Sequence, residues 1–519
     1  MRPITTEVLN KLQIAESLVR VAHTQRNLVP SEPGWEQLTA NNATITRVER
    51  YIKSLCRGGM EVATERELTA RKPGHGVRPV AFWGIKEQVL YDALTAAALH
   101  TLPVVDRSVA KYIEFIESPV SYAQEIQPDK ETPDVEKVLF FVFQSKVKYV
   151  VKSDLTSFYQ FIDHSILADE LISQGADFDI VSHLIELISE VTGRPLGLPQ
   201  LYHASDRLSE VYIDQVERAL LRKGFAVWRF NDDFRIACKS FSEAIAAIEA
   251  LDSAARSVGL AINELKTFTY QFSTYLLSTY DMDKLPEGGI ISLDDVEAAA
   301  GDYTDDFSQD PDSALDFIQS TNVTGKNDGL DLKSADRDDV RRIRRALDSL
   351  AKDQNAAAFD SIELLISFVP SLTPDLIKYM MAAGSGDHRI RAGEILDSII
   401  ESVSLNSWQQ VWLIEAFRAL DLLSDAAPSS IASRLAWVQK CFATGKEPLR
   451  GAAFWALAAS SHLEVVETVE EAMDAPEAVK SLYLAGVRDR LPINPTMQEG
   501  KSVSGLRGTD EITRALLAL

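Results

Sequence analysis

Apolar residues recur with different periods along the chain, and in its first part these periods predict both helices and a hairpin. In residues 5–28 they recur every three to four positions, which predicts helix. The same period returns in residues 84–102 and in residues 41–57, a basic amphipathic stretch that would be capped by Asn or Thr. Between these two stretches, residues 71–80 read RKPGHGVRPV, which predicts a β-hairpin with basic arms and a Gly-rich turn.

Strands and helices are also mixed in the next stretch of the chain. The pattern predicts, in order, a strand over 147–155, helices over 157–172 and 176–192, a loop over 193–200, a helix over 201–223, a tight hairpin over 229–234, a helix over 241–258 and short strands within 260–280. This order of strand, helices, hairpin, helix and strand is typical of an α+β fold.

Nearly every segment after residue 338 has helical period. Helices are expected near 339–352, 355–369, 373–383, 389–404, 407–424, 429–443, 448–460, 463–474 and 476–490. There is no strict repeat period, but consecutive short helix pairs predict an irregular α-solenoid of HEAT type. Before it, residues 291–316 carry nine acidic residues and no Lys or Arg, which favours a solvated linker. We therefore divide the chain into an α+β part (1–285), an acidic linker (286–337) and an all-α domain (338–519).

Composition places the protein among ordinary soluble globular chains. The 519 residues are 46% apolar and 25% charged, enough for two or three domains. Three cysteines, odd in number and far apart, suggest neither a disulfide framework nor a zinc site, so a reducing cytoplasm fits best. The N-terminal residues lack the apolar core of a signal peptide, and no run of 18 apolar residues occurs, so we expect no membrane span.

The net charge of −23 is unevenly distributed. Residues 291–519 hold 22 Lys and Arg against 37 Asp and Glu, whereas residues 41–90 hold nine basic and five acidic side chains. A local basic patch can therefore exist on an acidic protein. Strong non-specific binding to duplex nucleic acid is not expected, because it requires many phosphate contacts.

Two adjacent carboxylates, Asp232 and Asp233, are predicted at the tip of the 229–234 hairpin. They repel each other, and a fold keeps them there mainly when a cation lies between them. Asp154 ends the predicted strand 147–155, and beside the hairpin it would complete a site for two Mg²⁺ (or Mn²⁺) ions, with the carbonyl of Leu155 as a further oxygen ligand. Such a site supports phosphoryl transfer. Alone, Asp154 is equally well explained as a helix cap.

Two further residues could contact a nucleotide near these aspartates. Tyr159 follows Asp154 by five positions and could lie under the sugar, where its bulk would exclude a 2′-hydroxyl. Gln200 ends the loop Gly197-Leu198-Pro199-Gln200, whose shape lets the amide reach a nucleotide. The alternatives are a core aromatic for Tyr159 and an ordinary turn for the loop.

Basic residues could hold the triphosphate of that nucleotide. Arg78, with Arg71 and Lys72 behind it, lies on the predicted basic hairpin, and Arg forms forked contacts with phosphate. Lys266 could reach the β- and γ-phosphates or protonate pyrophosphate. The alternatives are a solvated charged turn and a surface lysine.

In order, the motifs are a basic hairpin, D-x4-[FY], G-x-P-Q, [FY]-x-D-D and L-x-x-N-x-x-K, a set that resembles the fingers and palm of reverse transcriptases over residues 40–280. The resemblance implies metal ligands at Asp154, Asp232 and Asp233, a steric gate at Tyr159, a nucleotide contact at Gln200, a triphosphate contact at Arg78 and a late-palm lysine at Lys266. Leu201 departs from the Gly that usually follows Pro-Gln, and Phe230 replaces the usual Tyr, with Asn231 before the aspartates. The first departure should change how a template or primer strand packs beside the nucleotide.

An acidic segment and a helical domain follow residue 280 in place of a basic thumb. This combination resembles the abortive-infection (Abi) and defence-associated reverse transcriptases of bacteria, of the unknown-group type, in which a palm is fused to a HEAT-like domain. The resemblance implies cytoplasmic antiphage defence, template-independent DNA synthesis from dNTPs, priming from a protein hydroxyl that leaves single-stranded DNA covalently attached, homo-oligomers and a phage or host protein as trigger. The candidate primer is Tyr51 on the basic helix, with Tyr112 and Tyr122 as others, and the alternative for each is an ordinary core or surface residue.

Two other functions remain open at this point. A conventional RNA-templated reverse transcriptase would require a primed RNA. A scaffold with an inactive palm would instead bind a phage or host protein on its helical domain, although retention of all three aspartates argues against it.

Overall fold

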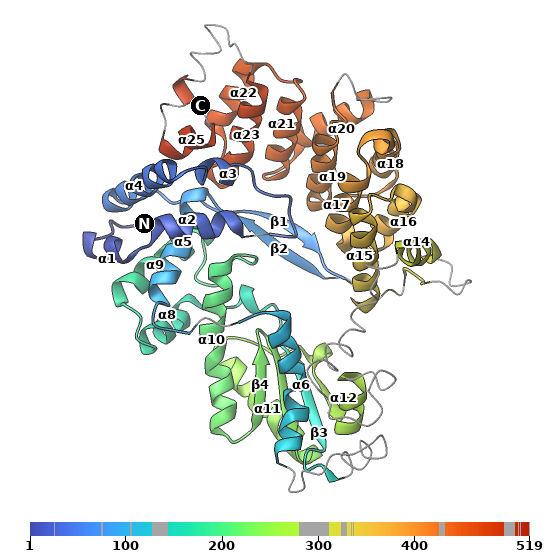
Figure 1. Ribbon diagram of the computed structural model, residues 1–519. Helices are drawn as coiled ribbons and strands as arrows, with labels where there is room; N and C mark the ends of the chain where they lie inside the picture. The colour runs from blue at the N-terminus through green and yellow to red at the C-terminus, as the bar shows by residue number, and fades with distance from the viewer. Residues whose placement is uncertain are drawn as a thin grey trace.

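The computed structural model describes residues 1–24, 26–73, 76–103, 106–126, 144–279, 311–322, 330–333, 335, 337–424, 431–491, 504–506, 508 and 510–517. N-terminal helices and a long β-hairpin lie between a small sheet with its helices and an arch of helices that contains the C-terminus (Figure 1). Much of the predicted linker, residues 286–310 and 323–329, lies outside the described residues. Within the described ranges, no helix has the length and apolar character that crossing a membrane requires.

The first part of the chain consists of helices and one hairpin. Its elements are α1 (Thr6–Lys11), α2 (Ile14–His23), α3 (Trp35–Leu38), α4 (Asn42–Gly58), β1 (Arg66–Arg71), β2 (Val77–Phe82), α5 (Ile85–Ala98) and α6 (Val109–Glu125). The side chain of Asn41 accepts a hydrogen bond from the Thr44 amide, which confirms the cap predicted for α4. Strands β1 and β2 pair antiparallel, so the predicted hairpin is confirmed and is longer than the sequence pattern indicated.

The next part is built on a four-stranded antiparallel sheet with the order β4-β5-β3-β6. Its elements are β3 (Tyr149–Asp154), the 3₁₀ turn η1 (Phe158–Gln160), α8 (His164–Ser173), α9 (Phe178–Thr192), α10 (His203–Arg222), β4 (Ala226–Phe230), β5 (Asp233–Cys238), α11 (Phe241–Ser257), the 3₁₀ turn η2 (Glu264–Lys266), β6 (Phe268–Gln271) and α12 (Phe272–Thr279). In the register of the central pair, Asp154 on β3 lies opposite Asp233 on β5. The sheet therefore brings together residues that are far apart in sequence.

Two expectations for this part of the chain were wrong in detail, and one helix in the first part was not predicted. The helix predicted over 157–172 begins only at His164, because the side chain of Asp163 accepts hydrogen bonds from the next turn and caps α8 there. Residues 260–280 hold one short strand and then helix α12, whose Phe272, Tyr275 and Leu276 are buried at helical spacing. Helix α6 was not predicted, and it contains Pro119 in its interior.

The region after residue 310 is largely helical. Its elements are α14 (Pro311–Ser320), α15 (Arg337–Lys352), η5 (Ala356–Ser361), α16 (Ile362–Phe368), η6 (Pro370–Leu372), α17 (Thr373–Ala383), η7 (Gly386–His388), α18 (Arg389–Ser402), α19 (Ser407–Ala419), α20 (Ile431–Thr444), α21 (Leu449–Ala459), α22 (Val465–Asp474), η8 (Glu477–Val479), α23 (Lys480–Arg490) and α25 (Glu511–Leu516). Helices α15, α17, α19, α21 and α23 pack one on the next, and α16, α18 and α20 do the same. Such layered stacking agrees with a solenoid, and its assignment to the HEAT type stays a prediction.

The helical region packs directly on the N-terminal part. The indole nitrogens of Trp408 and Trp412 on α19 both donate to the carbonyl oxygen of Leu28, and the Asn406 side chain donates to the carbonyl of Thr69 on β1. Both tryptophans are buried in the main hydrophobic core, which runs without a break from the N-terminal helices through α10 to α23. The hydrogen bonds and the shared core hold the helical region against the β1–β2 hairpin.

Candidate active site

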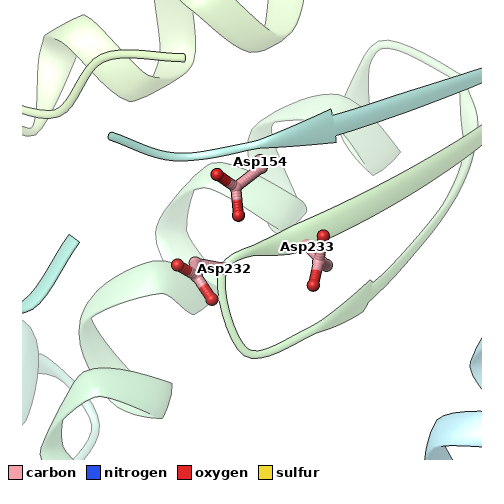
Figure 2. Close-up of side chains that lie close together, drawn as sticks. All are labelled: Asp154, Asp232 and Asp233. Carbon is pink, nitrogen blue, oxygen red and sulfur yellow. The ribbon is translucent and has the colours of Figure 1, made fainter. Parts of the chain in front are cut away.

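Three aspartates meet where strand β3 ends beside the tip of the β4–β5 hairpin. Figure 2 shows Asp154 on one side and Asp232 and Asp233 on the other. Each can offer one carboxylate oxygen such that all three oxygens lie within 4.8 Å of one another. The amide nitrogen of Leu155 donates to the carbonyl oxygen of Asp232 over 3.3 Å, which ties the strand end to the hairpin tip. The structure thus brings together the three residues that the sequence singled out.

The turn that carries Asp232 is very short. Strand β4 ends at Phe230 and β5 begins at Asp233, so the connecting loop has only Asn231 and Asp232. Asn231 has a φ of 55°, in the left-handed region that Asn tolerates better than most residues. Phe230 stands at the position where the reverse transcriptases that this sequence resembles usually have Tyr. Its ring packs against those of Tyr112 and Phe115 on α6. Local conformation and packing therefore both fix where the two aspartates lie.

Burial and mutual repulsion perturb the hairpin carboxylates. Burial, together with the charges of Asp154 and Asp233, raises the pKa of Asp232 to about 6. The pKa of Asp233 is also raised, chiefly by burial, although Arg235 opposes the shift. A bound cation lowers the repulsion between such close carboxylates. Carboxylate oxygens are also the ligands that hard divalent cations prefer. The triad therefore fits a divalent metal, while Mg²⁺ in particular stays a prediction.

Lys266 and Asn263 lie next to the triad. The Lys266 Nζ donates to Asp154 Oδ2 over 2.5 Å, and the Asn263 side-chain amide donates to the same oxygen over 3.3 Å. The Asn263 backbone amide also donates to the Asp154 carbonyl oxygen over 2.7 Å. The structure thus places the late-palm lysine at the candidate site, on a carboxylate rather than in solvent. Sequence reasoning noted Asn263 only as part of a motif and gave it no role.

Tyr159 lies in η1, and hydrogen bonds hold its hydroxyl. The hydroxyl donates to Asp206 Oδ1 over 2.6 Å and accepts from Arg107 Nη1 over 3.1 Å. Burial is the main cause that raises the pKa of this phenol. Neighbouring Phe158 is fully buried, whereas Tyr159 is partly buried and packs against the main core, so the alternative of a core aromatic stays open. Its role as a steric gate stays a prediction.

The Gly197–Gln200 loop packs against the backbone of Tyr159. The Leu198 amide donates to the Tyr159 carbonyl over 2.8 Å, and the Gly197 amide donates to the Ile162 carbonyl over 2.8 Å. Gly197 has a φ of 91°, and a Cβ there would lie 3.2 Å from the Gln160 carbonyl oxygen, so the position favours glycine. The loop thus places Gln200, which is half-buried just before α10, beside the segment that carries Tyr159.

Leu201 stands at the position where the reverse transcriptases that this sequence resembles usually have Gly. Its backbone conformation still suits glycine. Its φ is 70°, in the left-handed region, and its half-buried side chain packs on the main core. The residue has therefore changed while the local backbone has the shape that a glycine would adopt without strain.

Other predicted residues lie on elements outside the sheet that carries the triad. Arg78 is on β2 in the separate two-stranded sheet, and Lys72 follows β1 in the turn of the same hairpin. Within the described residues, no hydrogen bond or ion pair is seen between Arg78 and the three aspartates. Tyr51 on α4 lines a small cavity with residues of α23 and α25, where burial and nearby acids raise its pKa to about 12. The roles of these three residues stay predictions.

A group of charged residues beside the triad was missed entirely. Arg107, just before α6, forms ion pairs with Asp206 (3.0 Å) and Glu210 (2.6 Å) on α10. Arg229 on β4 also pairs with Glu210 (2.6 Å) and with Glu217 (3.1 Å). The only sequence signal was the spacing of the acids on α10, at i and i+4, which is common on solvated helices as well.

Comparisons with known proteins agree with this geometry. Residues 99–285 match the model of the family described as reverse transcriptase (RNA-dependent DNA polymerase). This part of the chain is therefore a reverse transcriptase domain, which indicates a nucleotidyltransferase of the polymerase type. The match covers the triad, Tyr159, Gln200 and Lys266 but begins after Arg78 and Tyr51. A search of the curated proteins found no match.

Solved structures of telomerase are similar at a low level. Telomerase from Candida albicans, in complex with a TWJ fragment of telomeric RNA, aligns with a TM-score of 0.30 and 12% identity, over 73% of this chain and 64% of that chain. Apo telomerase from Candida tropicalis aligns with a TM-score of 0.30 and 11% identity, over 79% of this chain and 73% of that one. The chain thus spans about two thirds of the length of these proteins, and similarity this low carries no argument about function.

Proposed function

We propose that this protein is a DNA polymerase that joins dNTPs with two Mg²⁺ ions, without a template and from a protein hydroxyl, in antiphage defence. The observation that carries the polymerase activity is the triad. Three carboxylate oxygens lie within 4.8 Å of one another inside a reverse transcriptase domain. The absence of a template, the protein primer and the defence role rest on the resemblance to abortive-infection reverse transcriptases.

The residues of the site have distinct roles in this proposal. Asp154, Asp232 and Asp233 would hold the cations, which when bound supply charge neutralisation for the attacking 3′-oxygen and the leaving pyrophosphate. Lys266, which donates to Asp154 Oδ2, would donate a proton to the pyrophosphate oxygen as it leaves. Tyr159 would exclude ribonucleotides by its bulk, and Gln200 would contact the nucleotide from the adjoining loop.

Two features support synthesis without a template. Leu201 follows Gln200 with a φ of 70°, so this chain carries a side chain at the position where the reverse transcriptases that it resembles usually have a glycine. The helical region, whose sequence from residue 311 carries 22 basic and 30 acidic side chains, packs against the β1–β2 hairpin. An acidic neighbour repels the phosphates of a long template–product duplex, whereas a short single strand tethered to the protein needs no such grip.

Nucleotide incorporation by the purified protein tests the proposal. Incubation with dNTPs and Mg²⁺ alone should yield DNA, and intact-mass analysis should show nucleotide additions to the protein, which Tyr51→Phe would abolish if Tyr51 is the primer. Synthesis that strictly requires primed RNA would instead establish the conventional templated enzyme. An unchanged protein mass with active enzyme would refute protein priming.

The defence role is tested in bacteria challenged with phage. The double variant Asp232→Asn with Asp233→Asn should lose both nucleotide incorporation and protection, because it lacks two of the three carboxylates. Protection that persists in this variant, with the protein folded, would favour a scaffold that binds a phage or host protein. Size measurements with and without phage infection would then test the predicted homo-oligomer and its trigger.

A further inference from the structure

A continuous chain of hydrogen bonds joins the hydroxyl of Tyr159 to the carboxylate of Asp232. Arg107 donates through Nη1 to the Tyr159 hydroxyl and through Nη2 to the side-chain oxygen of Asn231, each over 3.1 Å. The side-chain nitrogen of Asn231 then donates to Asp232 Oδ1 over 2.9 Å. One guanidinium therefore contacts both the predicted steric gate and the turn that carries a predicted metal ligand.

Acidic residues hold Arg107 in this position. Its Nη2 lies 2.6 Å from Glu210 Oε1, and it also donates to the carbonyl oxygen of Asp206 over 2.8 Å. The Arg107 side chain is only 24% exposed and that of Glu210 only 6%. Ion pairs with good geometry at this depth are strongly directional, and removal of one partner leaves the others unsatisfied. The guanidinium is thus fixed on the α10 side before it reaches the hairpin.

The hairpin turn is also held through its backbone. Arg229 Nη1 donates to the carbonyl oxygen of Asn231 over 3.1 Å and to Glu210 Oε2 over 2.6 Å. Glu210 therefore bridges two arginines, one on the side chain of Asn231 and one on its main chain. This double attachment restricts both the backbone and the side chain of the residue that precedes the two aspartates.

Asn is the residue type that satisfies every contact at position 231. The φ of 55° suits Gly or Asn, but Gly has no side chain to accept from Arg107 or donate to Asp232. Asp would accept from Arg107 but could not donate to Asp232, and it would add a fourth negative charge to the site. The asparagine before the two aspartates therefore has a specific structural use.

We infer that Arg107 is a positioning residue that couples sugar selection to cation binding, because it orients the Tyr159 hydroxyl and, through Asn231, the Asp232 carboxylate. This inference rests on the proposed function for its account of sugar selection. Its account of cation binding depends only on the triad. A loss of Arg107 should therefore change both sugar selection, which involves Tyr159, and cation binding, which involves Asp232.

Three variants separate these two properties. Asn231→Gly keeps the turn but removes the link to Asp232, so it should weaken Mn²⁺ binding in calorimetry about 10-fold, as the loss of a group that orients a metal ligand does, and leave sugar selection unchanged. Tyr159→Phe keeps the ring but removes the hydroxyl, so hydrogen bonds no longer hold the ring in place. This variant should raise the use of rNTPs relative to dNTPs about fivefold, at unchanged Mn²⁺ affinity. Arg107→Gln should change both, and Arg107→Lys should restore neither, because an ammonium cannot bridge the two acceptors in the same geometry.

A matched control lies on α10, the helix that carries Asp206 and Glu210. Arg218→Gln removes an arginine that pairs with Asp214 and Glu170 and makes no contact with the network, so it should change neither property. If Arg107→Gln changes only one property or none, the coupling is refuted. If that variant does not fold, unchanged Mn²⁺ affinity in Asn231→Gly refutes it instead.

The outcome for the proposed function is read separately. Wild-type protein that incorporates no nucleotide would refute the polymerase proposal. Calorimetry with Mn²⁺ on Asn231→Gly and the wild type would still decide whether Asn231 positions Asp232.

Discussion

The left-handed backbone at Leu201 leads to a prediction that separates backbone strain from packing. We compare Leu201→Gly with Leu201→Ala, and use Leu198→Gly and Leu198→Ala in the same loop as controls. Leu201 has a φ of 70°, whereas Leu198 is not among the residues with positive φ and is only 5% exposed. Both leucines pack on the same core, so the pairs differ chiefly in backbone conformation.

The expected magnitudes follow from the two backbones. At an ordinary position Gly is less favourable than Ala by about 0.5–1 kcal/mol, because it loses more conformational freedom on folding. At position 201 the left-handed conformation costs an L-residue such as Ala about 1–2 kcal/mol, a cost that Gly avoids. This offsets the usual disadvantage of Gly. We therefore expect Gly and Ala to be nearly equal in stability at position 201, with Gly at least as good, and Gly to be clearly worse at position 198.

Urea denaturation of the four variants measures these differences. The free energy of unfolding should show a Gly-minus-Ala difference that is about 1–2 kcal/mol more favourable at position 201 than at position 198. Equal differences at the two positions would show that the backbone of Leu201 carries no strain. Leu201→Gly should also raise incorporation on primed RNA relative to synthesis without a template. A Leu201→Gly variant that still ignores primed RNA would contradict the role given to this side chain.

Three further outcomes follow from the contacts of the site and of the interface between the parts. Asp232→Asn should stabilise the cation-free protein at pH 7.5 by on the order of 3 kcal/mol, because burial raises the pKa of Asp232 to about 6. A raised carboxyl pKa contributes stability below pH 4, and this contribution is lost as the pH rises through 6. Thermal unfolding should therefore show no gain for the variant at pH 4. Lys266→Met should lower kcat about 100-fold with dNTPs, by removal of the proton donor, and an unchanged kcat in steady-state assays would exclude that role. Trp412→Phe removes one donor to the Leu28 carbonyl and should lower the free energy of unfolding by about 1 kcal/mol and speed hydrogen exchange near α19, whereas Trp228→Phe, on β4 and packed against Tyr122, should not affect exchange there.

Local patterns predicted the elements of this fold better than they predicted its polar contacts. Helical spacing identified most helices after residue 338, because each short helix buries one face on its neighbours. The pattern failed at Asp163, whose side chain caps α8 and delays its start, and at residues 272–279, where a strand was expected and helix α12 forms. The cap at Asp163 is not visible in hydrophobic spacing alone, whereas the helical spacing of the buried residues in α12 was present in the sequence and was interpreted as strand.

The triad was predictable for a different reason from the network beside it. Adjacent Asp232 and Asp233 between apolar residues are unusual enough to indicate a site, and Asp154 ends an apolar strand. Arg107 carries no such sign, because its partners are separated from it by roughly a hundred residues and meet it only once the sheet and α10 are in place. Charged residues of this kind look like surface residues until the fold is known.

The distribution of charge in the site explains why the triad remains available to a cation. Arg107 and Arg229 lie near the hairpin, but their charges face Asp206, Glu210 and Glu217 rather than the three aspartates. Of the described residues, Lys266 forms an ion pair with Asp154, and Arg235 and Lys152 act on Asp233 through their charges. Arg107 and Arg229 can therefore fix the geometry of the hairpin without neutralising it. The remaining negative charge is what a divalent cation would balance, and its binding should stabilise the folded protein in proportion to ln(1 + [L]/Kd).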